Sequence, residues 1–464
     1  MNLLNGENVR HVHCIGVGGI GVSALAEILI KRGFSVSGSD VVDSDRLHYL
    51  RTLGATTFVG HERSHIGTAD LVVYSSAIDS QNPELLEAMA LGLPLIKRGH
   101  LLANLMQFYY GVAISGTHGK TTTTALVAHI LLQAKADPTY FIGGIPLDCD
   151  SPVAIGQSDI FVTEADESDA SFLYLNPKIA VVTNIECDHM DTYAGSEAAL
   201  CDSFLTFLNT LPSDGTAILC LDDDNIQQFR SELLCSSLFY GVNEQADYVI
   251  MNYQQNELVG HACVKTPTET ITVELALPGL HNMKNAVAAM MVAHRLGVDT
   301  NIIVQALKTF KGVGRRFQSH GTVVLNHKCV AVYEDYGHHP TEIRETYRAA
   351  KLAFPQKRVV LIFQPHRFTR TRDLMAEFVD VLSQVDYLML LPTYAASELE
   401  IVEANSNALN AALCKTGLIP YYLDDTEKLY ESLDRLVQEG DVLMFQGAGD
   451  VGKLAKGLLE RSDA

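Results

Sequence analysis

Several features common in secreted, membrane and nucleic-acid-binding proteins are missing from this 464-residue sequence. No apolar run approaches the roughly 20 residues needed to cross a bilayer. The opening stretch, MNLLNGENVR, has no hydrophobic segment of the kind that a secretory signal contains. Lys and Arg total 34 against 55 Asp and Glu, giving a net charge of −21, which disfavours binding to nucleic acid or anionic membranes. We therefore expect a cytoplasmic protein with neither kind of partner.

The cysteines provide no recognisable framework. There are nine of them, scattered along the chain, and none belongs to a Cys-x-x-Cys pair. An odd number without paired spacing argues against a disulfide scaffold and against a zinc ribbon. We expect reduced thiols.

What the sequence does contain is an alternation of short β-branched runs with helical patterns along nearly its whole length, which predicts α/β domains with parallel sheets. The chain is about three times the usual length of one domain. The pattern divides it into three blocks, and we predict domains over residues 1–108, 109–312 and 313–464. A glycine-rich segment, Lys311–Phe317, is expected to act as a hinge before the third block.

The segment AISGTHGKTTTT, Ala113 to Thr124, joins an apolar run to a helical pattern through a glycine turn. Backbone N–H groups in such a turn, together with the dipole of the following helix, favour a bound phosphate. Lys120 can neutralise charge between β- and γ-phosphates, and the Thr121 hydroxyl can hold Mg²⁺. Gly116 and Gly119 are separated by two residues, where the common Walker motif has four. An ordinary polar turn is therefore the alternative, but the flanking strand and helix patterns favour phosphate binding.

Two acidic segments, EADESD and NIECDHMD, also follow apolar runs. Ligands gather at the carboxyl ends of strands in open α/β sheets, so both segments are expected to face Lys120. Mg²⁺ prefers oxygen ligands and needs help from carboxylates. We predict that Glu164 and His189 are metal ligands, and we interpret most of the other acids from Asp166 to Asp191 as solvated turn or capping residues.

These segments occur in an order that resembles a known family. GTHGKTTTT, EADESD, NIECDHMDTY, LPGLHNMKNA, GVGRRF, EDYGHHPTE and FQPHRFTRTRDL, with GVGGIG and VVYSSAI in front, are similar to the Mur ligases of peptidoglycan synthesis. The resemblance covers nearly the whole chain. It implies a Rossmann-like domain for a UDP-sugar, a central P-loop-type ATPase domain with a mostly parallel sheet, and a Rossmann-like C-terminal domain for an amino acid.

Within the family, the resemblance is strongest to members that join L-alanine to the lactyl carboxylate of UDP-N-acetylmuramate. It implies that ATP phosphorylates this carboxylate and that the alanine amine then displaces phosphate. The implied cofactors are ATP and two magnesium ions, with manganese as the alternative metal. The oligomeric state is left open between a monomer and a homodimer.

For the nucleotide, the resemblance implies catalytic roles for Lys120, Glu164, His189, Arg316 and Asp335, with Thr121, Glu164 and His189 on the metal. Asn282 and Asn285 are spaced by three at a helix start, so both amides can face the adenine, although helix capping explains Asn282 equally well. Tyr336 is expected to stack on the adenine. The full ATP set is Gly116, Thr117, His118, Gly119, Lys120, Thr121, Thr122, Asn282, Asn285, Arg316, Asp335 and Tyr336.

One departure concerns the metal. Several Mur ligases use a carbamylated lysine beyond the metal histidine, but this sequence has no lysine between Lys178 and Lys265. The second magnesium would then rely on Glu164, His189, substrate oxygens and water.

The segment HRFTRTR supplies the expected amino-acid site. Arginine forks suit carboxylates, so His366, Arg367 and Arg370 are predicted to bind the alanine carboxylate, with His338 close by. A solvated basic loop is the alternative.

Near the N-terminus, Gly16, Gly18 and Gly21 form a G-x-G-x-x-G pattern, and Asp40 ends the next apolar run. The pattern alone indicates a nicotinamide-dependent oxidoreductase. An oxidoreductase would leave the lysine turn and the arginine loop unexplained. The glycine pattern recognises a pyrophosphate, and a UDP-sugar carries one too. We predict UDP-sugar contacts from Gly16, Gly18, Gly19, Gly21, Asp40 and Ser75. A second glycine repeat, GAGDVG at 447–452, is interpreted as a tight turn before a terminal helix.

Two further functions remain as alternatives. A related ligase attaches a whole tripeptide to the same nucleotide sugar, but GVGGIG and DYGHHP favour the alanine reaction. A nucleotide-gated binding protein without ligase activity is disfavoured by the retained lysine, glutamate, histidine and arginines.

Overall fold

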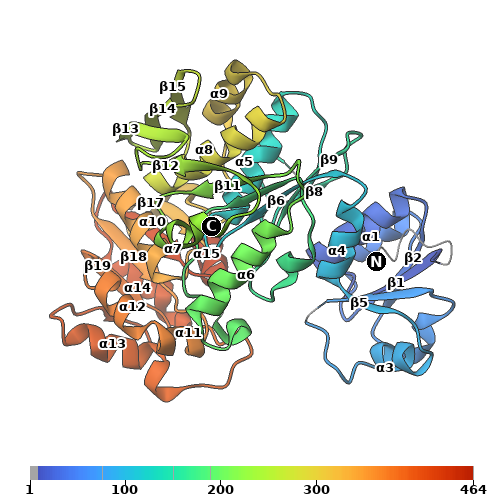
Figure 1. The fold of residues 1–464 in the computed structure, drawn as a ribbon. Helices are drawn as coiled ribbons and strands as arrows, with labels where there is room; N and C mark the ends of the chain where they lie inside the picture. Colours follow the sequence, from blue (N-terminus) through green and yellow to red (C-terminus); the bar gives the residue numbers. More distant parts are fainter. Residues whose placement is uncertain (1–8, 76, 150, 189, 463–464) are drawn as a thin grey trace.

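The computed structural model describes residues 9–75, 77–149, 151–188 and 190–462. Its strands form three sheets that follow one another along the chain, and each sheet is flanked by helices in a lobe of its own (Figure 1). The first lobe, in blue, lies apart from the third, in orange and red, and the central lobe connects them. The predicted α/β architecture with three domains and largely parallel sheets is confirmed.

The first sheet is entirely parallel. In spatial order its strands are β3 (Thr56–Val59), β2 (Ser35–Asp40), β1 (His11–Ile15), β4 (Leu71–Tyr74) and β5 (Leu95–Lys97). The strand order reverses between β1 and β4, and such a reversal opens a crevice at the carboxyl ends of the strands. The helices of this domain are α1 (Ile20–Lys31), α2 (Asp45–Thr52), α3 (Pro83–Ala90) and α4 (Arg98–Met106).

The central sheet has a parallel core extended by antiparallel strands. The core consists of β12 (Ser236–Gly241), β11 (Thr216–Cys220), β10 (Ile179–Val182), β6 (Tyr110–Ser115), β9 (Ile160–Glu164) and β7 (Thr139–Phe141). At one edge, β13 (Tyr248–Asn256) runs parallel to β12 and continues into the antiparallel β14 (Val259–Lys265) and β15 (Thr270–Leu275). At the other edge, β8 (Val153–Ala154) pairs antiparallel with β7.

Helix α5 (Lys120–Gln133) starts at the lysine turn and is buried from Thr122 to Leu131. A helix buried around its whole circumference needs neighbouring helices or strands on every side. It contacts β6 and β9 of the sheet as well as α8 (Leu280–Arg295) and α9 (Thr300–Thr309). This packing fixes the end of the helix at which a phosphate would bind. The other helices of the domain are α6 (Glu197–Asn209) and α7 (Asp224–Phe229).

The third sheet is parallel except for its first strand. Its order is β16 (Gln318–Leu325), β17 (Lys328–Asp335), β21 (Val442–Gln446), β18 (Val359–Phe363), β19 (Tyr387–Leu390) and β20 (Tyr421–Tyr422). The accompanying helices are α10 (Pro340–Ala353), α11 (Phe368–Asp373), α12 (Met375–Leu382), α13 (Ser406–Cys414), α14 (Leu429–Leu436) and α15 (Val451–Ser462). The GAGDVG repeat is the turn between β21 and α15, the terminal helix of the chain.

The segment that connects the second sheet to the third is attached to a loop of the central domain. Val313 forms an antiparallel bridge with Pro146, and Gly314 N donates to Ile145 O at 2.8 Å. Positive φ angles of 61° and 48° follow at Arg315 and Phe317. The expected hinge segment is therefore anchored at Val313 and Gly314, with left-handed backbone on both sides of the anchor, at Gly312 with φ of 93° and at Arg315 and Phe317.

No helix in the described part of the chain is long and apolar enough to cross a membrane. All nine cysteines lie within the described residues, and they are free thiols.

Candidate functional site

The lysine turn leaves β6 and enters α5 through two glycines with left-handed backbone, Gly116 with φ of 122° and Gly119 with φ of 85°. A Cβ on Gly116 would lie 2.2 Å from Thr183 Oγ1, and one on Gly119 would lie 2.6 Å from Asn285 Oδ1. Both positions therefore need glycine for space as well as for conformation. The N-cap residue of α5, Gly119, supplies no side-chain cap, so the first N–H groups of the helix are available to an anion.

Lys120 is held by Glu167, which sequence reasoning placed among the solvated acids. Its Nζ lies 2.7 and 2.8 Å from the two carboxylate oxygens of Glu167 and donates to Gly116 O at 2.6 Å. Glu167 is only 2% exposed, so the solvated interpretation is wrong for this residue. Burial lowers the pKa of Lys120, but the neighbouring carboxylates outweigh burial and raise it, so the side chain keeps its charge.

Two of the three predicted metal ligands lie together beside Lys120. Thr121 Oγ1 donates to Glu164 Oε2 at 3.1 Å, and Gly143 N donates to Glu164 Oε1 at 2.5 Å. A hydroxyl and a carboxylate are oxygen donors of the kind that Mg²⁺ prefers, so these residues fit the expected ion. The third ligand, His189, lies outside the described residues.

A cavity of about 400 Å³ opens between the central and C-terminal domains, and we call it the central cavity. It is lined on one side by the lysine turn and α8, and on the other by α10 and the end of β17. Eight predicted ATP residues line it: His118, Gly119, Thr121, Thr122, Asn282, Asn285, Arg316 and Asp335. The structure thus brings the two α8 amides, the turn and Arg316 around one space large enough for part of a nucleotide.

The remaining predicted ATP residues do not line this cavity, although three of them belong to the lysine turn beside it. Gly116, Thr117, Lys120 and Tyr336 are not among the residues that line the central cavity. The ring of Tyr336 packs against two guanidinium groups, with Arg315 Cζ at 4.7 Å and Arg316 Cζ at 5.0 Å from its centroid. Tyr336 therefore orients the arginines, and the structure does not bring it to Asn282 or Asn285, where it was expected to stack on adenine.

Arg316 and Asp335 occupy the seam where the linker meets the third sheet. Arg316 Nη1 lies 3.3 Å from Glu342 Oε1 on α10. Asp335 accepts hydrogen bonds from Phe317 N at 2.9 Å and Gly337 N at 2.8 Å. Burial raises the pKa of Asp335, against the effect of Arg316. Asp335 thus fixes the backbone that presents Arg316 to the central cavity.

Three of the four predicted amino-acid residues form one cluster. His338 and His366 have ring centroids 5.7 Å apart, and Arg370 Nη1 lies 3.3 Å from His366 Nδ1. Burial lowers the pKa of His338 to about 3 and that of His366 to about 4, so both rings are neutral at pH 7. Arg367, with φ of 69°, is the N-cap residue of α11 on the same loop and is exposed.

In the first domain, a cavity of about 560 Å³ lies at the carboxyl ends of β1 and β4, and we call it the N-terminal cavity. Of the predicted UDP-sugar residues it is lined by Gly16, Gly19, Asp40 and Ser75. Gly18 supports its wall, because Gly18 N donates to Asp40 Oδ2 at 2.9 Å. Gly21 lies outside it and lines a different space.

That space is a cavity of about 260 Å³ between the first and central domains, which we call the interdomain cavity. Gly21 and Arg98 line it from the first domain, and Lys120, Glu164 and Asp166 line it from the central one. A Cβ on Gly21 would lie 2.5 Å from Arg98 Nη1, so the glycine makes room for this guanidinium.

Sequence reasoning missed a buried network that reaches the N-terminal cavity. The carboxylate of Glu84 accepts hydrogen bonds from Ser39 Oγ at 2.5 Å and from His65 Nδ1 at 2.8 Å. Ser39 Oγ also lies 3.0 Å from His61 Nδ1, and the His61 ring lines the cavity. Because the single Ser39 proton goes to Glu84, His61 must donate through Nδ1, which leaves its Nε2 as an acceptor. Isolated polar residues in apolar segments gave no pattern that could have shown this.

Three family models match consecutive parts of the chain. Residues 11–110 match the Mur ligase family, catalytic domain, residues 114–293 the Mur ligase middle domain, and residues 315–449 the Mur ligase, glutamate ligase domain. The three matches follow the three sheets.

Solved structures of Mur enzymes are similar over most of the chain. The UDP-N-acetylmuramate-alanine ligase of Thermotoga maritima is 29% identical, with a TM-score of 0.80, over 98% of this chain and 99% of that one. The UDP-N-acetylmuramate:L-alanyl-gamma-D-glutamyl-meso-diaminopimelate ligase of Neisseria meningitides is 28% identical, with a TM-score of 0.60, over 66% of this chain and 100% of that one. A MurF ligase of Thermotoga maritima in complex with ADP has the same fold at 18% identity and a TM-score of 0.63, over 92% of this chain and 96% of that one.

Proposed function

The chain belongs to the Mur ligase family, and from this premise we propose that it joins L-alanine to the lactyl carboxylate of UDP-N-acetylmuramate at the expense of ATP. The products would be UDP-N-acetylmuramoyl-L-alanine, ADP and phosphate, in cytoplasmic synthesis of a peptidoglycan precursor. We propose Mg²⁺ as the metal, held by Thr121 and Glu164 with His189.

One observation carries this proposal. Thr121 lines the central cavity, and its neighbour Lys120 lines the interdomain cavity. The lysine turn therefore lies between two cavities. The central cavity is lined by Asn282, Asn285 and Arg316, and the interdomain cavity is lined by Gly21 and Arg98 of the first domain. A triphosphate in the central cavity would end at this turn, and the acid of a sugar held by the first domain would approach it from the other side.

The first step overcomes the poor reactivity of a carboxylate. A lactyl oxygen attacks the γ-phosphorus, the bond to the β-γ bridging oxygen breaks, and ADP leaves with an acyl phosphate formed. Lys120 and Arg316 would stabilise the charge that spreads over the transferred group. Mg²⁺ would supply Lewis-acid stabilisation of the phosphate oxygens.

The second step forms the amide. The alanine ammonium group first gives up a proton to solvent, and its amine attacks the acyl carbon. The tetrahedral intermediate expels phosphate, which takes up the second proton that the nitrogen loses. Arg370 is paired with Asp188 and would exchange this carboxylate for that of alanine, while the neutral rings of His338 and His366 add no repulsion to a cationic amino acid as it enters. Water must be excluded, because acyl phosphates hydrolyse. The C-terminal domain, which already walls the central cavity, would do this.

L-alanine is proposed over a tripeptide because of two observations. The alanine ligase of Thermotoga maritima is 29% identical with a TM-score of 0.80 over 98% of this chain, whereas a murein peptide ligase of Psychrobacter arcticus is 23% identical with a TM-score of 0.68 over 97% of this chain. The segments GVGGIG and DYGHHP also favour the alanine reaction over the attachment of a tripeptide.

The test is phosphate release with ATP, Mg²⁺ and UDP-N-acetylmuramate, with L-alanine, L-serine, glycine or L-Ala-γ-D-Glu-meso-diaminopimelate added in turn. We expect release that needs both the sugar nucleotide and an amino acid, with the highest kcat/KM for L-alanine. Turnover with the tripeptide alone would reassign the substrate. Phosphate release that ignores the sugar nucleotide would contradict the ligase reaction itself.

A further inference from the structure

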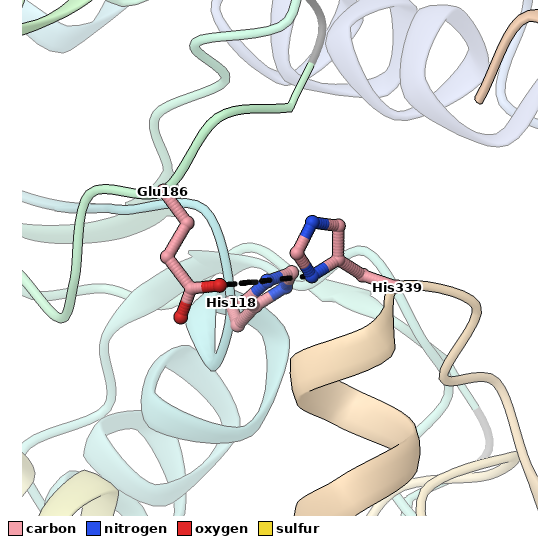
Figure 2. Close-up of side chains that lie close together, drawn as sticks. All are labelled: His118, Glu186 and His339. Atoms are coloured by element: carbon pink, nitrogen blue, oxygen red, sulfur yellow. Dashed lines mark ion pairs between the residues drawn. The ribbon is translucent and has the colours of Figure 1, made fainter. Parts of the chain in front are cut away.

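Three side chains to which the proposed reaction assigns no catalytic step, one of them the predicted ATP residue His118, converge where α10 meets the lysine turn (Figure 2). His118 comes from the turn, Glu186 follows β10, and His339 is the N-cap residue of α10. Glu186 Oε2 lies 3.7 Å from His118 Nε2 and 3.6 Å from His339 Nδ1. In Figure 2 the two rings and the carboxylate face a common point from two domains.

These spacings are too long for hydrogen bonds, which weaken beyond about 3.2 Å. They are close to the separation of two ligands on one ion. Tetrahedral Zn²⁺ bound at about 2.0–2.1 Å sets neighbouring ligand atoms roughly 3.3 Å apart. His118 Nε2 is buried and accepts or donates no hydrogen bond within the described structure. One ligand atom, His118 Nε2, is thus left unsatisfied by the protein, whereas His339 Nδ1 accepts from Thr341 N at 3.3 Å and would exchange this hydrogen bond for the ion.

The surroundings support the ligands. His118 Nδ1 lies 3.4 Å from Glu342 Oε1, an arrangement that orients the ring with Nε2 toward Glu186. Thr341 Oγ1 donates to Glu186 Oε2 at 2.5 Å. Metal-binding histidines commonly have a carboxylate on their second nitrogen, and metal-binding carboxylates commonly accept a further hydrogen bond.

We propose that His118, Glu186 and His339 form a site for a divalent transition metal ion, with Zn²⁺ as the reference ion, that ties the C-terminal domain to the central domain. Two imidazoles and one carboxylate suit Zn²⁺ and are a poor set for Mg²⁺. The site is separate from the oxygen donors Thr121 and Glu164. It needs no assumption about the substrate of the enzyme.

Occupancy has a mechanical consequence. His118 and Glu186 line one side of the central cavity, and Thr341 and Glu342 line the other. An ion bonded to both sides holds α10 against the lysine turn, and it therefore opposes the opening through which a nucleotide enters and leaves. Zn²⁺ should act as an inhibitor that slows exchange rather than as a cofactor.

The test uses the full chain without nucleotide or Mg²⁺. Titration with Co²⁺ should give the strong visible absorption of a four-coordinate ion at one equivalent, and Zn²⁺ should abolish it stoichiometrically. His339→Asn keeps an acceptor that can cap α10 but removes a ligand, and Glu186→Gln removes another. We expect each to weaken Zn²⁺ binding at least about 100-fold, as loss of a direct ligand should exceed the 10–100-fold effect of supporting residues. His327→Asn, at an exposed histidine, is the matched control and should bind normally.

A second readout addresses the link between domains. Zn²⁺ should reduce the radius of gyration measured by small-angle scattering in the parent protein but not in His339→Asn. Unchanged Zn²⁺ affinity in both ligand variants would overturn the site. Tight binding at these residues without compaction would overturn the domain link. Circular dichroism verifies folding of each variant, and His339→Asn alone suffices if Glu186→Gln does not fold.

Discussion

Arg370 of the C-terminal domain forms an ion pair with Asp188 of the central domain, and its Nη2 lies 3.1 and 3.2 Å from the two carboxylate oxygens. Both side chains are largely buried, at 6% and 10% exposed. The ion pair therefore lies within the contact between domains, and its arginine is the group proposed to receive the alanine carboxylate.

Arg370→Lys should raise the KM for L-alanine by roughly 10–100-fold, because a point charge cannot replace the two parallel hydrogen bonds of a guanidinium. The KM values for ATP and UDP-N-acetylmuramate should stay within about twofold. Initial rates of phosphate release, with each substrate varied in turn, give the three constants. Equal loss for all three substrates would show that Arg370 serves only to hold the domains together.

Lys120→Ala should reduce kcat by at least about 1,000-fold, since it removes a cation from the transferred phosphate. UDP-sugar binding, measured by calorimetry, should persist because the N-terminal cavity is untouched. The variant also leaves Glu167 buried without its partner, and breaking such a pair costs about 3–5 kcal/mol unless the acid takes up a proton.

The double variant Lys120→Ala/Glu167→Gln separates these two effects. It should regain stability toward urea relative to Lys120→Ala, because no carboxylate is left unpaired. Activity should remain lost. Recovery of activity along with stability would mean that Lys120 has a structural role only.

Ser39→Ala should weaken discrimination between UDP and CDP. The Ser39 hydroxyl fixes the His61 tautomer that leaves Nε2 as an acceptor toward the N-terminal cavity. Uracil presents an N3–H donor to such an acceptor, whereas cytosine presents a lone pair. We expect the parent protein to prefer UDP and the variant to narrow that preference by about 10-fold, measured by competition binding. If Ser39→Ala prefers UDP over CDP as strongly as the parent protein does, the nucleotide base does not contact His61.

Glu84→Gln should destabilise the first domain by about 1–3 kcal/mol at pH 7, as His13, Ser39 and His65 lose an ionised acceptor. Although burial raises the pKa of Glu84, these hydrogen bonds outweigh it and lower the pKa from 4.5 to about 2. A depressed pKa gives stability that is complete above 4.5 and lost as the pH falls toward 2. The difference between parent and variant in urea denaturation should accordingly shrink between pH 5 and pH 2. A constant difference over that range would contradict the assignment.

The parts of this site that follow from local sequence were predictable. Gly116, Gly119 and Lys120 lie in one turn whose backbone needs are legible from spacing, and α/β alternation indicates where strands end. The unpredicted contacts join distant segments. Lys120 and Glu167 are 47 residues apart, and Thr341 and Glu186 are 155 apart, so neither pair has a spacing that local pattern could reveal.

The contacts of Tyr336 also could not be predicted from local sequence. The expectation that it stacks on adenine came from the family resemblance. Its ring instead contacts Arg315 and Arg316, whose guanidinium groups supply a closer cationic partner. Which neighbour an aromatic ring contacts depends on the path of the linker, and that path is set by positive φ at Arg315 and Phe317, which the sequence does not display.

The bridge between Val313 and Pro146 ties the start of the third lobe to the central domain. Arg316 lies three residues beyond that point, so any swing of the lobe carries its guanidinium along a short arc toward or away from the lysine turn. Opening the lobe and withdrawing positive charge from the reaction centre are then a single motion. The phosphate product would lose the positive charge of Arg316 as the lobe opens and lets the product leave.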